Sequence, residues 1–227
     1  MTFRVASVQF APTKGRIDRN LDRVVEAATG ARNAGADLVV FPETIVSGYF
    51  LEGGVLEAAR TADEIRDELE RRYEGGVLDL CLGFYERSED GILYNSAGYF
   101  ELGPTGVRTI AVYRKIFLPT YGVFDEERFV TGGQGLGVFP TRFGKVGILI
   151  CEDVWHGVTP MLTALAGARL LLVPAASPAR GFGPGGVENH DRYRRLFRAI
   201  AEEHGMWCVS SQLVGFEGGK GFVGGSM

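Results

Sequence analysis

Short, wholly apolar runs alternate with helical patterns at both ends of this chain, and this alternation constrains the fold more than any other feature. Residues 38–41, 146–150 and 170–173 lack polar alternation and are short, so they predict strands buried on both faces. One helical apolar face is formed by Ile17, Leu21, Val24, Val25 and Ala28. Strand–helix–strand succession predicts neighbouring parallel strands. We therefore expect an α/β fold with two sheets and helices outside each, a four-layer αββα sandwich.

The remaining elements follow from the same patterns. We expect further strands at residues 2–10, 78–86, 92–101, 107–113, 138–141 and 206–211. We expect helices over residues 54–72, after Trp155 and over about 189–204, and a glycine-rich loop at 181–186. Asp18 is expected to cap the first helix and Gly35 to end it. No linker or low-complexity spacer divides the sequence, so we expect one domain over residues 1–227.

The composition excludes several classes of partner. A formal net charge of −4, without a basic and aromatic cluster, gives no reason to expect nucleic acid or an anionic membrane as a partner. The longest apolar run, residues 170–176, is too short to span a bilayer, and the first residues resemble a strand more than a signal peptide. Cys81, Cys151 and Cys208 lie far apart, a poor framework for disulfides or zinc. We therefore expect a cytoplasmic protein that needs no metal.

Three reactive side chains stand where predicted strands end. Glu43 follows Leu-Val-Val-Phe-Pro, Lys115 follows Ile-Ala-Val-Tyr-Arg and Cys151 follows Val-Gly-Ile-Leu-Ile. Taken singly, each has an ordinary structural explanation: a capping carboxylate, an exposed amine and a core thiol. However, α/β proteins build their sites at the carboxyl ends of strands. A carboxylate, an amine and a thiol in three equivalent positions therefore predict an active site, whereas Cys81 and Cys208 are expected in the core.

The segments around these residues resemble those of a known family. In chain order they are Phe-Pro-Glu-Thr (41–44), Tyr-Arg-Lys-Ile-Phe-Leu-Pro (113–119) and Ile-Leu-Ile-Cys-Glu-Asp-Val-Trp (148–155). Further matches lie at residues 5–9, 83–97 and 221–226. Together they resemble the nitrilase, or carbon–nitrogen hydrolase, superfamily over nearly the whole chain. The resemblance implies an αββα sandwich, in agreement with the strand order.

The resemblance also implies a role for each reactive side chain. Cys151 matches the nucleophile of the family, Glu43 its general base, and Lys115 its lysine. A further glutamate near the site is matched by Glu126, with Glu127 the alternative if the register differs by one. The base would take the thiol proton and pass it to the departing ammonia or amine, while the lysine and a backbone N–H stabilise the oxyanion. Water would then hydrolyse the thioester, without a cofactor.

Other interpretations of these residues stay open at this point. A papain-like pair would need a histidine brought from far along the chain, and His156 lies only five residues beyond Cys151. A metal site formed by Cys151, Asp153 and His156 lacks a second cluster of ligands. The glycines at 132–137 resemble a nucleotide loop but precede a strand. A catalytically inactive binding subunit on the same fold would have no chemical need for all three reactive side chains.

Within the enzyme class, a general amidase and a glutaminase are both open. Residues 47–49, 119–126, 151–155 and 177–178 resemble the glutamine-hydrolysing domain of NAD synthetase. That resemblance implies a pocket lined by Tyr49, Tyr121, Phe124, Glu152 and Ser177. Two phenols, a carboxylate and a hydroxyl favour a small amide with a polar or charged acyl end, because each buried polar group left unpaired costs ~1–3 kcal/mol.

The sequence departs from the family pattern in three places. Phe117 stands where the lysine segment commonly has histidine, outside the three catalytic positions. After Ser177 and Pro178 the chain continues Ala-Arg-Gly-Phe-Gly, where the NAD synthetase pocket usually has an aromatic residue. The chain stops at Met227, where superfamily members continue with one or two strands and a tail that packs on a second subunit. We therefore expect a fragment or a form with a reduced tail. The family resemblance implies a homodimer or higher homo-oligomer.

Overall fold

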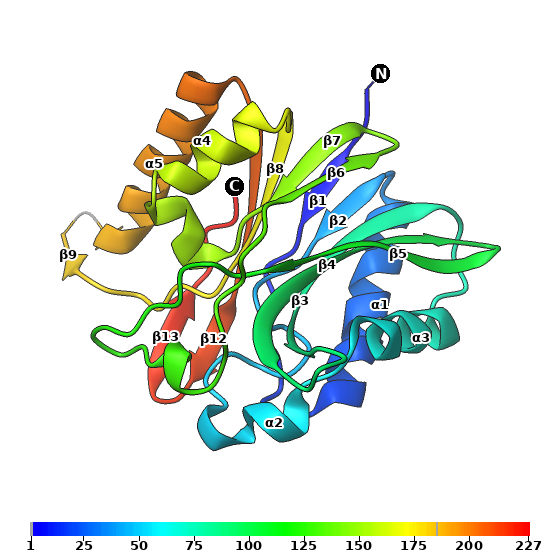
Figure 1. The fold of residues 1–227 in the computed structure, drawn as a ribbon, viewed down its shortest axis with the longest axis horizontal. Coiled ribbons are helices and arrows are strands. Elements are labelled where there is room, and N and C mark those ends of the chain that lie inside the picture. Colours follow the sequence, from blue (N-terminus) through cyan, green and yellow to red (C-terminus); the bar gives the residue numbers. More distant parts are fainter. Residues whose placement is uncertain (1, 185) are drawn as a thin grey trace.

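Two large β-sheets lie face to face in the computed structural model, which describes residues 2–184 and 186–227 (Figure 1). The first sheet runs in the order β1-β2-β3-β4-β5 and the second in the order β11-β8-β7-β6. The first contains β1 (Val5–Ser7), β2 (Leu38–Val40), β3 (Leu78–Arg87), β4 (Leu93–Gly103) and β5 (Gly106–Arg114). The second contains β6 (Gly137–Thr141), β7 (Gly144–Ile148), β8 (Leu170–Ala175) and β11 (Trp207–Gln212).

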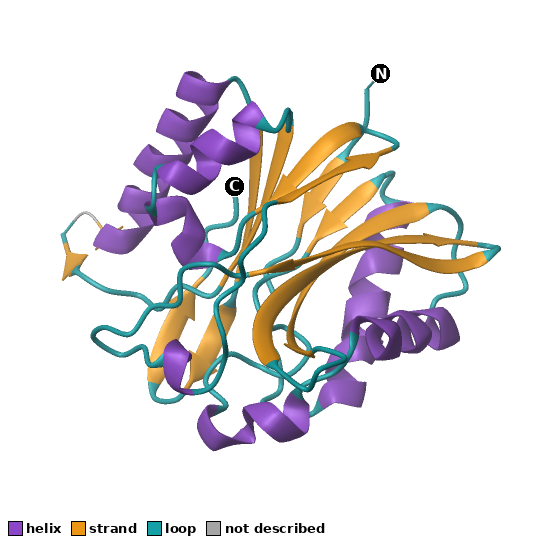
Figure 2. Ribbon diagram, viewed as in Figure 1, coloured by secondary structure: helices purple, strands orange, loops and turns teal. Residues whose placement is uncertain are grey.

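Helices cover the outer faces of both sheets and complete the predicted αββα sandwich (Figure 2). The first sheet carries α1 (Ile17–Asn33) and α3 (Ala62–Arg72), and the second carries α4 (Val158–Leu165) and α5 (Glu188–His204). The short helices are η1 (Glu52–Gly54), α2 (Val55–Ala58), η2 (Glu126–Arg128) and η3 (Cys151–Trp155). Among residues 2–184 and 186–227, no helix has both the length and the apolar character that crossing a membrane requires.

Strand β2 shows why its sequence is apolar throughout. Leu38 and Val40 belong to the core shared by the two sheets, whereas Val39 packs with the side chains of α1 and α3. Both faces of β2 are therefore buried, as the unbroken apolar run predicts. Cys81 lies fully buried in the core between the sheets, and the partly buried Cys208 packs against that core.

The strand directions bring distant parts of the chain to one edge. Strand β2 is parallel to β3, and the antiparallel pairs β3–β4 and β4–β5 turn β5 to the same direction. In the second sheet, β7, β8 and β11 are parallel. Glu43 lies just past the end of β2, Lys115 directly follows β5, and Cys151 lies just past β7. Because β2 and β5 end at the same edge, Glu43 and Lys115 can meet there although 72 positions separate them.

The predicted helix over residues 54–72 is divided into α2 and α3. Helix α3 begins with a capping box, in which Thr61 Oγ1 accepts the N–H of Glu64 at 3.1 Å and Glu64 Oε2 accepts the N–H of Thr61 at 2.7 Å. The pattern Thr-Ala-Asp-Glu marks this start in the sequence. Asp18 lies in the first turn of α1, after the N-cap residue Arg16, so its predicted role as the cap is wrong. In the first turn, its carboxylate still interacts favourably with the positive end of the helix dipole.

The sequence did not indicate a hairpin near the end of the chain. It is formed by β12 (Val214–Glu217) and β13 (Lys220–Val223), which pair in antiparallel fashion. Gly218 and Gly219 make the turn with φ angles of 55° and 73°, a conformation that favours glycine. Within the predicted glycine-rich loop, β9 (Phe182–Gly183) pairs with β10 (Gly186–Val187). Residue 185 of that loop lies outside the described residues.

Candidate active site

A buried lysine joins two carboxylates at the carboxyl edge of the first sheet. The Nζ atom of Lys115 donates to Oε1 of Glu43 and to Oε1 of Glu126, each at 2.7 Å. Lys115 and Glu43 are completely buried and Glu126 is 6% exposed. Glu127, the alternative register, has an exposed side chain. Because an ammonium group has three N–H donors, these bonds leave one for a substrate oxygen.

Two further donors hold the Glu43 carboxylate. The side-chain amide of Asn95 donates to Oε1 of Glu43 at 2.8 Å, and the backbone N–H of Ala176 donates to Oε2 at 2.8 Å. The same Asn95 amide lies 3.5 Å from Oε2 of Glu126. Glu43 is thus bonded to groups that follow β5 and β8 and to a side chain of β4. Its orientation is set by tertiary contacts from both sheets.

The charges in this cluster alter one another's protonation. Burial by itself lowers the pKa of Lys115, but the Glu126 and Glu43 carboxylates outweigh it, and the pKa is raised well above its usual range. Burial raises the pKa of Glu126, an effect that Lys115 opposes and Glu43 reinforces. The lysine is therefore a fixed cation at neutral pH. A buried cation held by two carboxylates keeps its charge without solvent.

Cys151 occupies a strained turn at the end of β7. Its φ angle of 45° lies in the left-handed region, which residues with a Cβ rarely adopt. Asp153 holds this turn, because its Oδ2 accepts the N–H of Ile150 at 2.9 Å. Its Oδ1 accepts the N–H groups of Ile116 and Phe117 at 3.1 and 2.9 Å. Asp153 therefore ties the cysteine turn to the segment directly after Lys115.

The environment of the Cys151 thiol opposes its ionisation at rest. Burial is the largest influence and raises the pKa of Cys151, and the Glu43 carboxylate raises it further. Lys115 acts in the opposite direction, as does a hydrogen bond with Tyr193, whose hydroxyl lies 3.3 Å from Sγ. The resting thiol is therefore neutral at neutral pH. It needs a nearby base to take its proton as attack begins.

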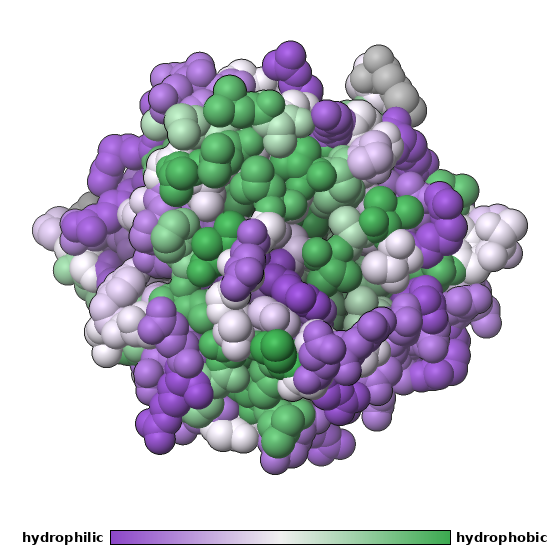
Figure 3. All heavy atoms as spheres, viewed as in Figure 1, coloured by the Kyte–Doolittle hydropathy of each residue, from purple (hydrophilic) through white to green (hydrophobic). Residues whose placement is uncertain are grey.

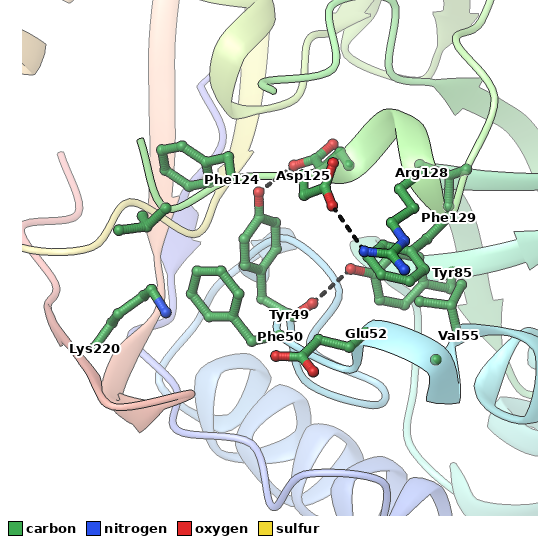
Figure 4. Close-up of a pocket in the computed structure, with 14 residues that line it drawn as sticks. Tyr49, Phe50, Glu52, Val55, Tyr85, Phe124, Asp125, Arg128, Phe129 and Lys220 are labelled. Atoms are coloured by element: carbon green, nitrogen blue, oxygen red, sulfur yellow. Dashed lines mark hydrogen bonds and ion pairs between the residues drawn. The ribbon is translucent and has the colours of Figure 1, made fainter. Parts of the chain in front are cut away.

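A cavity of about 440 Å³ lies on the Tyr49 side of this cluster (Figure 4). Tyr49 and Phe50 form one wall, and Arg128 and Phe129 lie opposite. The Tyr49 hydroxyl donates to Glu126, and burial raises the pKa of Tyr49 well above its usual range. Glu126 also lines the cavity, but Cys151 does not. This cavity therefore reaches the back of the carboxylate–lysine cluster and not the sulfur.

A second cavity has a volume of about 240 Å³, and Cys151 does not line it either. It is lined by Tyr121, Trp155, Arg180, Gly181, Glu188, Asn189 and Arg192. The Tyr121 hydroxyl donates to Oε2 of Glu152 at 2.8 Å, and burial raises the pKa of Tyr121 to about 12. The Trp155 ring stands edge-on to Tyr193, the residue that touches Cys151. Trp155, which lines this cavity, therefore packs on the residue that contacts the sulfur.

Of the five predicted substrate-pocket residues, three line one of these cavities and two, Glu152 and Ser177, line neither. Tyr49 and Phe124 line the larger cavity and Tyr121 lines the smaller. The Phe124 and Tyr121 rings, one from each cavity, meet edge to face with centroids 5.6 Å apart. Glu152 accepts from Tyr121, and Ser177 Oγ accepts from the amide of Asn189 at 2.9 Å; Tyr121 and Asn189 both line the smaller cavity.

The geometry disfavours the rival sites. The His156 ring stacks on Phe117 at 3.6 Å, and its Nε2 lies 3.7 Å from Glu152, so it is engaged away from Cys151. Over the described ranges 2–184 and 186–227, no group of three His, Cys, Asp or Glu side chains is arranged to hold a metal ion. Among the glycines at 132–137, a Cβ on Gly133 would lie 2.3 Å from a backbone oxygen of β5. Gly133 therefore allows close packing on β5.

Sequence reasoning missed three residues that contact this site. Asn95 lies in the quoted segment Tyr-Asn-Ser-Ala, and Asp153 directly follows Cys-Glu, so both carry a signal in the family motifs. Tyr193 carries none, because it lies among the charged residues of α5, 42 positions beyond Cys151.

The comparisons with known proteins agree with this geometry. A sequence model of the Carbon-nitrogen hydrolase family matches residues 4–227. The Glutamine-dependent NAD(+) synthetase of Acinetobacter baylyi is 36% identical over 177 residues, which cover 78% of this chain and 32% of that protein. The enzyme of the same name from Xylella fastidiosa strain Temecula1 is 32% identical over 228 residues, covering 99% of this chain and 40% of its own. This chain thus spans between a third and two fifths of the length of these curated relatives.

Solved structures show the same fold. The glutamine-dependent NAD+ synthetase of Acinetobacter baumannii, solved with ADP, superposes with a TM-score of 0.85 at 31% identity, covering 99% of this chain and 40% of that one. The NitN amidase of Nesterenkonia sp. AN1 superposes with a TM-score of 0.81 at 27% identity, covering 99% and 84%. These matches confirm the resemblance to the NAD synthetase glutaminase domain. With the match over residues 4–227, they show that this chain belongs to the carbon–nitrogen hydrolase family, whose members are enzymes acting on carbon–nitrogen bonds.

Proposed function

We propose that this chain hydrolyses a small non-peptide amide with Cys151 as nucleophile, Glu43 as general base and Lys115 as oxyanion stabiliser. The observation that carries the proposal is the buried Lys115 ammonium, which donates to Glu43 at 2.7 Å and acts electrostatically on Cys151. Burying a cation and a carboxylate costs much desolvation energy. A thiol that only fills the core would not need these two charges beside it. Such clusters beside a nucleophile are typical of active sites.

The first half of the reaction forms a thioester. Glu43 takes the proton of the Cys151 thiol as the sulfur attacks the amide carbonyl carbon. The carbonyl oxygen becomes an oxyanion, and the remaining N–H of Lys115 donates to it. As the carbon–nitrogen bond breaks, Glu43 gives its proton to the leaving nitrogen. Ammonia or an amine departs, and the acyl group stays on Cys151.

Water completes the reaction in the second half. Glu43 takes a proton from water, and the resulting hydroxide attacks the thioester carbon. Lys115 again stabilises the oxyanion. The carbon–sulfur bond breaks, the carboxylic acid leaves, and Cys151 recovers its proton from Glu43. The sum is amide plus water giving acid plus ammonia or amine, with no change in oxidation state, so the proposed mechanism uses no cofactor.

Glu126 is proposed to hold Lys115 in position. Its Oε1 accepts from Nζ of Lys115 at 2.7 Å. Because Glu43 accepts from the same Nζ, the ammonium is fixed between two carboxylates. The Tyr49 hydroxyl donates to the same Glu126 oxygen. Because Tyr49 and Glu126 line the larger cavity, they form the rear wall of the proposed site. Their contacts support a role in positioning the lysine, with substrate on the other side.

The substrate is proposed to carry a charged acyl end. The Glu152 carboxylate accepts from Tyr121, and Arg180 lines the same cavity as Tyr121. The Arg180 guanidinium lies 5.3 Å from the centroid of the Phe124 ring. An amino group could bind the carboxylate and a carboxylate could bind the guanidinium. A purely aliphatic amide would make neither of these charge-assisted contacts.

A glutaminase that supplies ammonia to a synthetase is the second candidate. It is favoured by the pair of opposite charges, Glu152 and Arg180, which matches an acyl group bearing both an amino group and a carboxylate. It is also favoured by the relatives named glutamine-dependent NAD(+) synthetase. The departure after Pro178 puts Ala179 and Arg180 where that pocket usually has an aromatic residue. We therefore keep other polar amides, including N-carbamoyl compounds, beside glutamine.

The test is to trap the acyl-enzyme and to screen ammonia release. Incubation with a slow amide, followed by peptide mass spectrometry, should place an acyl group on Cys151. Cys151→Ala should abolish turnover, and the matched control Cys208→Ala should not. An adduct on Cys81 or Cys208 instead would contradict the assignment. No adduct and no release from any amide or nitrile would favour the inactive binding subunit.

The screen also separates the two candidates. It compares kcat/KM for glutamine, asparagine, N-carbamoyl amino acids, nitriles and butyramide. Each lost polar contact should cost about tenfold in kcat/KM. Butyramide as the best substrate would contradict the charged-end proposal. If another polar amide has a higher kcat/KM than glutamine, the general amidase is favoured over the glutaminase.

We also propose a cytoplasmic homodimer or higher homo-oligomer. Helix α4 exposes apolar side chains along its outer face: Val158, Met161, Leu162 and Leu165. Figure 3 shows this apolar surface over α4. Apolar patches of this kind are typical of interfaces between proteins. Light scattering of the wild type and of Leu165→Glu tests this proposal, with a smaller particle expected for the variant.

A further inference from the structure

The phenol of Tyr193 contacts the Cys151 sulfur from the helix side of the site. Its hydroxyl lies 3.3 Å from Sγ, and the side chain is 2% exposed. The ring stands edge-on to Trp155 with centroids 4.9 Å apart and stacks on Phe197 at 5.8 Å. Two aromatic neighbours thus fix the direction of the hydroxyl. The contact comes from α5 on the second sheet, whereas Lys115 follows the last strand of the first.

This contact changes character when the sulfur ionises. A neutral thiol and a phenol can each donate to the other, and such a bond is weak. A thiolate can only accept, and a hydrogen bond to a charged group is roughly twice as strong. Burial raises the pKa of Tyr193 well above its usual range, and the nearby Cys151 raises it further, so the phenol keeps its proton. The protonated phenol is therefore available as a donor whenever a thiolate forms.

Two other groups favour the thiolate, Lys115 and the backbone N–H of Ala176, and both are engaged elsewhere. The Ala176 N–H donates to Oε2 of Glu43 at 2.8 Å. The Lys115 ammonium already donates to Glu43 and Glu126, and its last N–H is the one proposed for the oxyanion. Burial of Cys151 meanwhile makes a bare thiolate costly. A donor that points at Sγ offsets this cost. The hydroxyl 3.3 Å away has the position for that role.

We propose that Tyr193 is a catalytic hydrogen-bond donor to the sulfur anion of Cys151, an inference that rests on the proposed function. It holds the thiolate that forms as Glu43 takes the thiol proton. It holds the same anion again when the carbon–sulfur bond breaks and the sulfur leaves with the bonding electron pair. Tyr193 keeps its proton in both steps, so it lowers the energy of the ion without changing the proton balance.

The test is the pH dependence of Cys151 alkylation in Tyr193→Phe, which keeps the ring and removes the hydroxyl. The rate of iodoacetamide addition to Cys151 is followed by peptide mass spectrometry. Loss of the donor makes the thiolate less favourable, so the profile should move to higher pH by about one unit, or tenfold in rate at a given pH. The matched control is Tyr99→Phe, whose hydroxyl is also buried but donates to Asp79. It should leave the profile in place.

A second variant should shift the pH profile of alkylation in the opposite direction. Replacing Tyr193 by 3-fluorotyrosine makes the phenol a better donor, so the profile should move to lower pH. If the profiles of the wild type and Tyr193→Phe superimpose, the phenol only fills space and the inference is wrong. A shift to lower pH in Tyr193→Phe would contradict it equally. These outcomes are independent of the acyl adduct on Cys151, whose absence would instead reject the proposed function.

Discussion

The side-chain amide of Asn95 lies 2.8 Å from Oε1 of Glu43, the oxygen that also accepts from Lys115. The proposed base is therefore held by a neutral donor as well as by a cation. Asn95→Asp keeps the shape but replaces the donor with a second carboxylate. The variant loses the donor to Oε1 and adds a like charge beside the Glu43 and Glu126 carboxylates, so kcat/KM should fall by about tenfold or more. An unchanged kcat/KM in Asn95→Asp would contradict this role of Asn95.

Lys115→Met and Glu43→Gln remove the charge and the proton acceptor while they keep side-chain length. Each variant should lower kcat by at least ~10², the usual cost of losing an oxyanion donor or a general base. Lys115→Met should also lower Tm, because it leaves two buried carboxylates without their cation. Steady-state kinetics and thermal unfolding measure both effects. Lys145→Met, at an exposed lysine, is the control; near wild-type kcat in either site variant would mean that the site is misassigned.

Gly83 of β3 approaches the Glu43 segment too closely for a side chain. A Cβ there would lie 2.6 Å from the Pro42 oxygen and the Thr44 nitrogen, and 2.8 Å from the Glu43 Cα. Gly83→Ala should therefore displace Glu43, and a misplacement of about 1 Å can cost ~10² in rate. Kinetics and unfolding should both reveal the change.

A matched glycine provides the control for that experiment. Gly30 lies in α1, and a Cβ at this position would meet no other atom within 4 Å. Gly30→Ala should therefore raise the free energy of unfolding by roughly 0.5–1 kcal/mol, because alanine loses less backbone entropy in a helix. If both alanine variants keep the kcat of the wild type, the Glu43 segment can shift without loss of function.

Glu217 links the β12–β13 hairpin to the segment that carries Tyr49. Its Oε2 accepts the N–H groups of Tyr49 and Phe50 at 2.7 and 3.1 Å, while the buried Oε1 has no hydrogen-bond partner in the described part of the chain. Burial raises the pKa of Glu217, so its contribution to stability is complete below its unfolded pKa of about 4.3. It is lost as pH rises through the higher folded value.

Glu217→Gln removes this titration and keeps an oxygen for the two amides. The Tm of the variant minus that of the wild type should therefore become more positive as pH rises from acid to neutral. Thermal unfolding at a series of pH values measures this difference, with Glu127→Gln, an exposed carboxylate, as the control. A difference that stays flat or falls with pH would contradict the assignment to Glu217.

Local patterns in the sequence were enough to predict the class of the fold and the family. The unbroken apolar runs predict strands buried on both faces, and β2, β8 and the last three residues of β7 are buried in this way. The signature segments around Glu43, Lys115 and Cys151 identify the carbon–nitrogen hydrolase family. Each segment is a short strand end, so the residues that identify it are consecutive in the sequence. The helix break before Thr61 was also visible in a local capping pattern, although we expected one continuous helix.

Only the tertiary structure decided which side chains meet at the site. The bonds of Asn95 to Glu43, of Glu217 to Tyr49 and of Tyr193 to Cys151 join residues 42 to 168 positions apart. Their partners depend on strand order, on the direction in which each side chain leaves its element and on the helix packed behind it. Periodicity reports whether a residue is buried, but not what it faces. Hydrogen-bond contacts across two sheets therefore emerge only when the chain is folded.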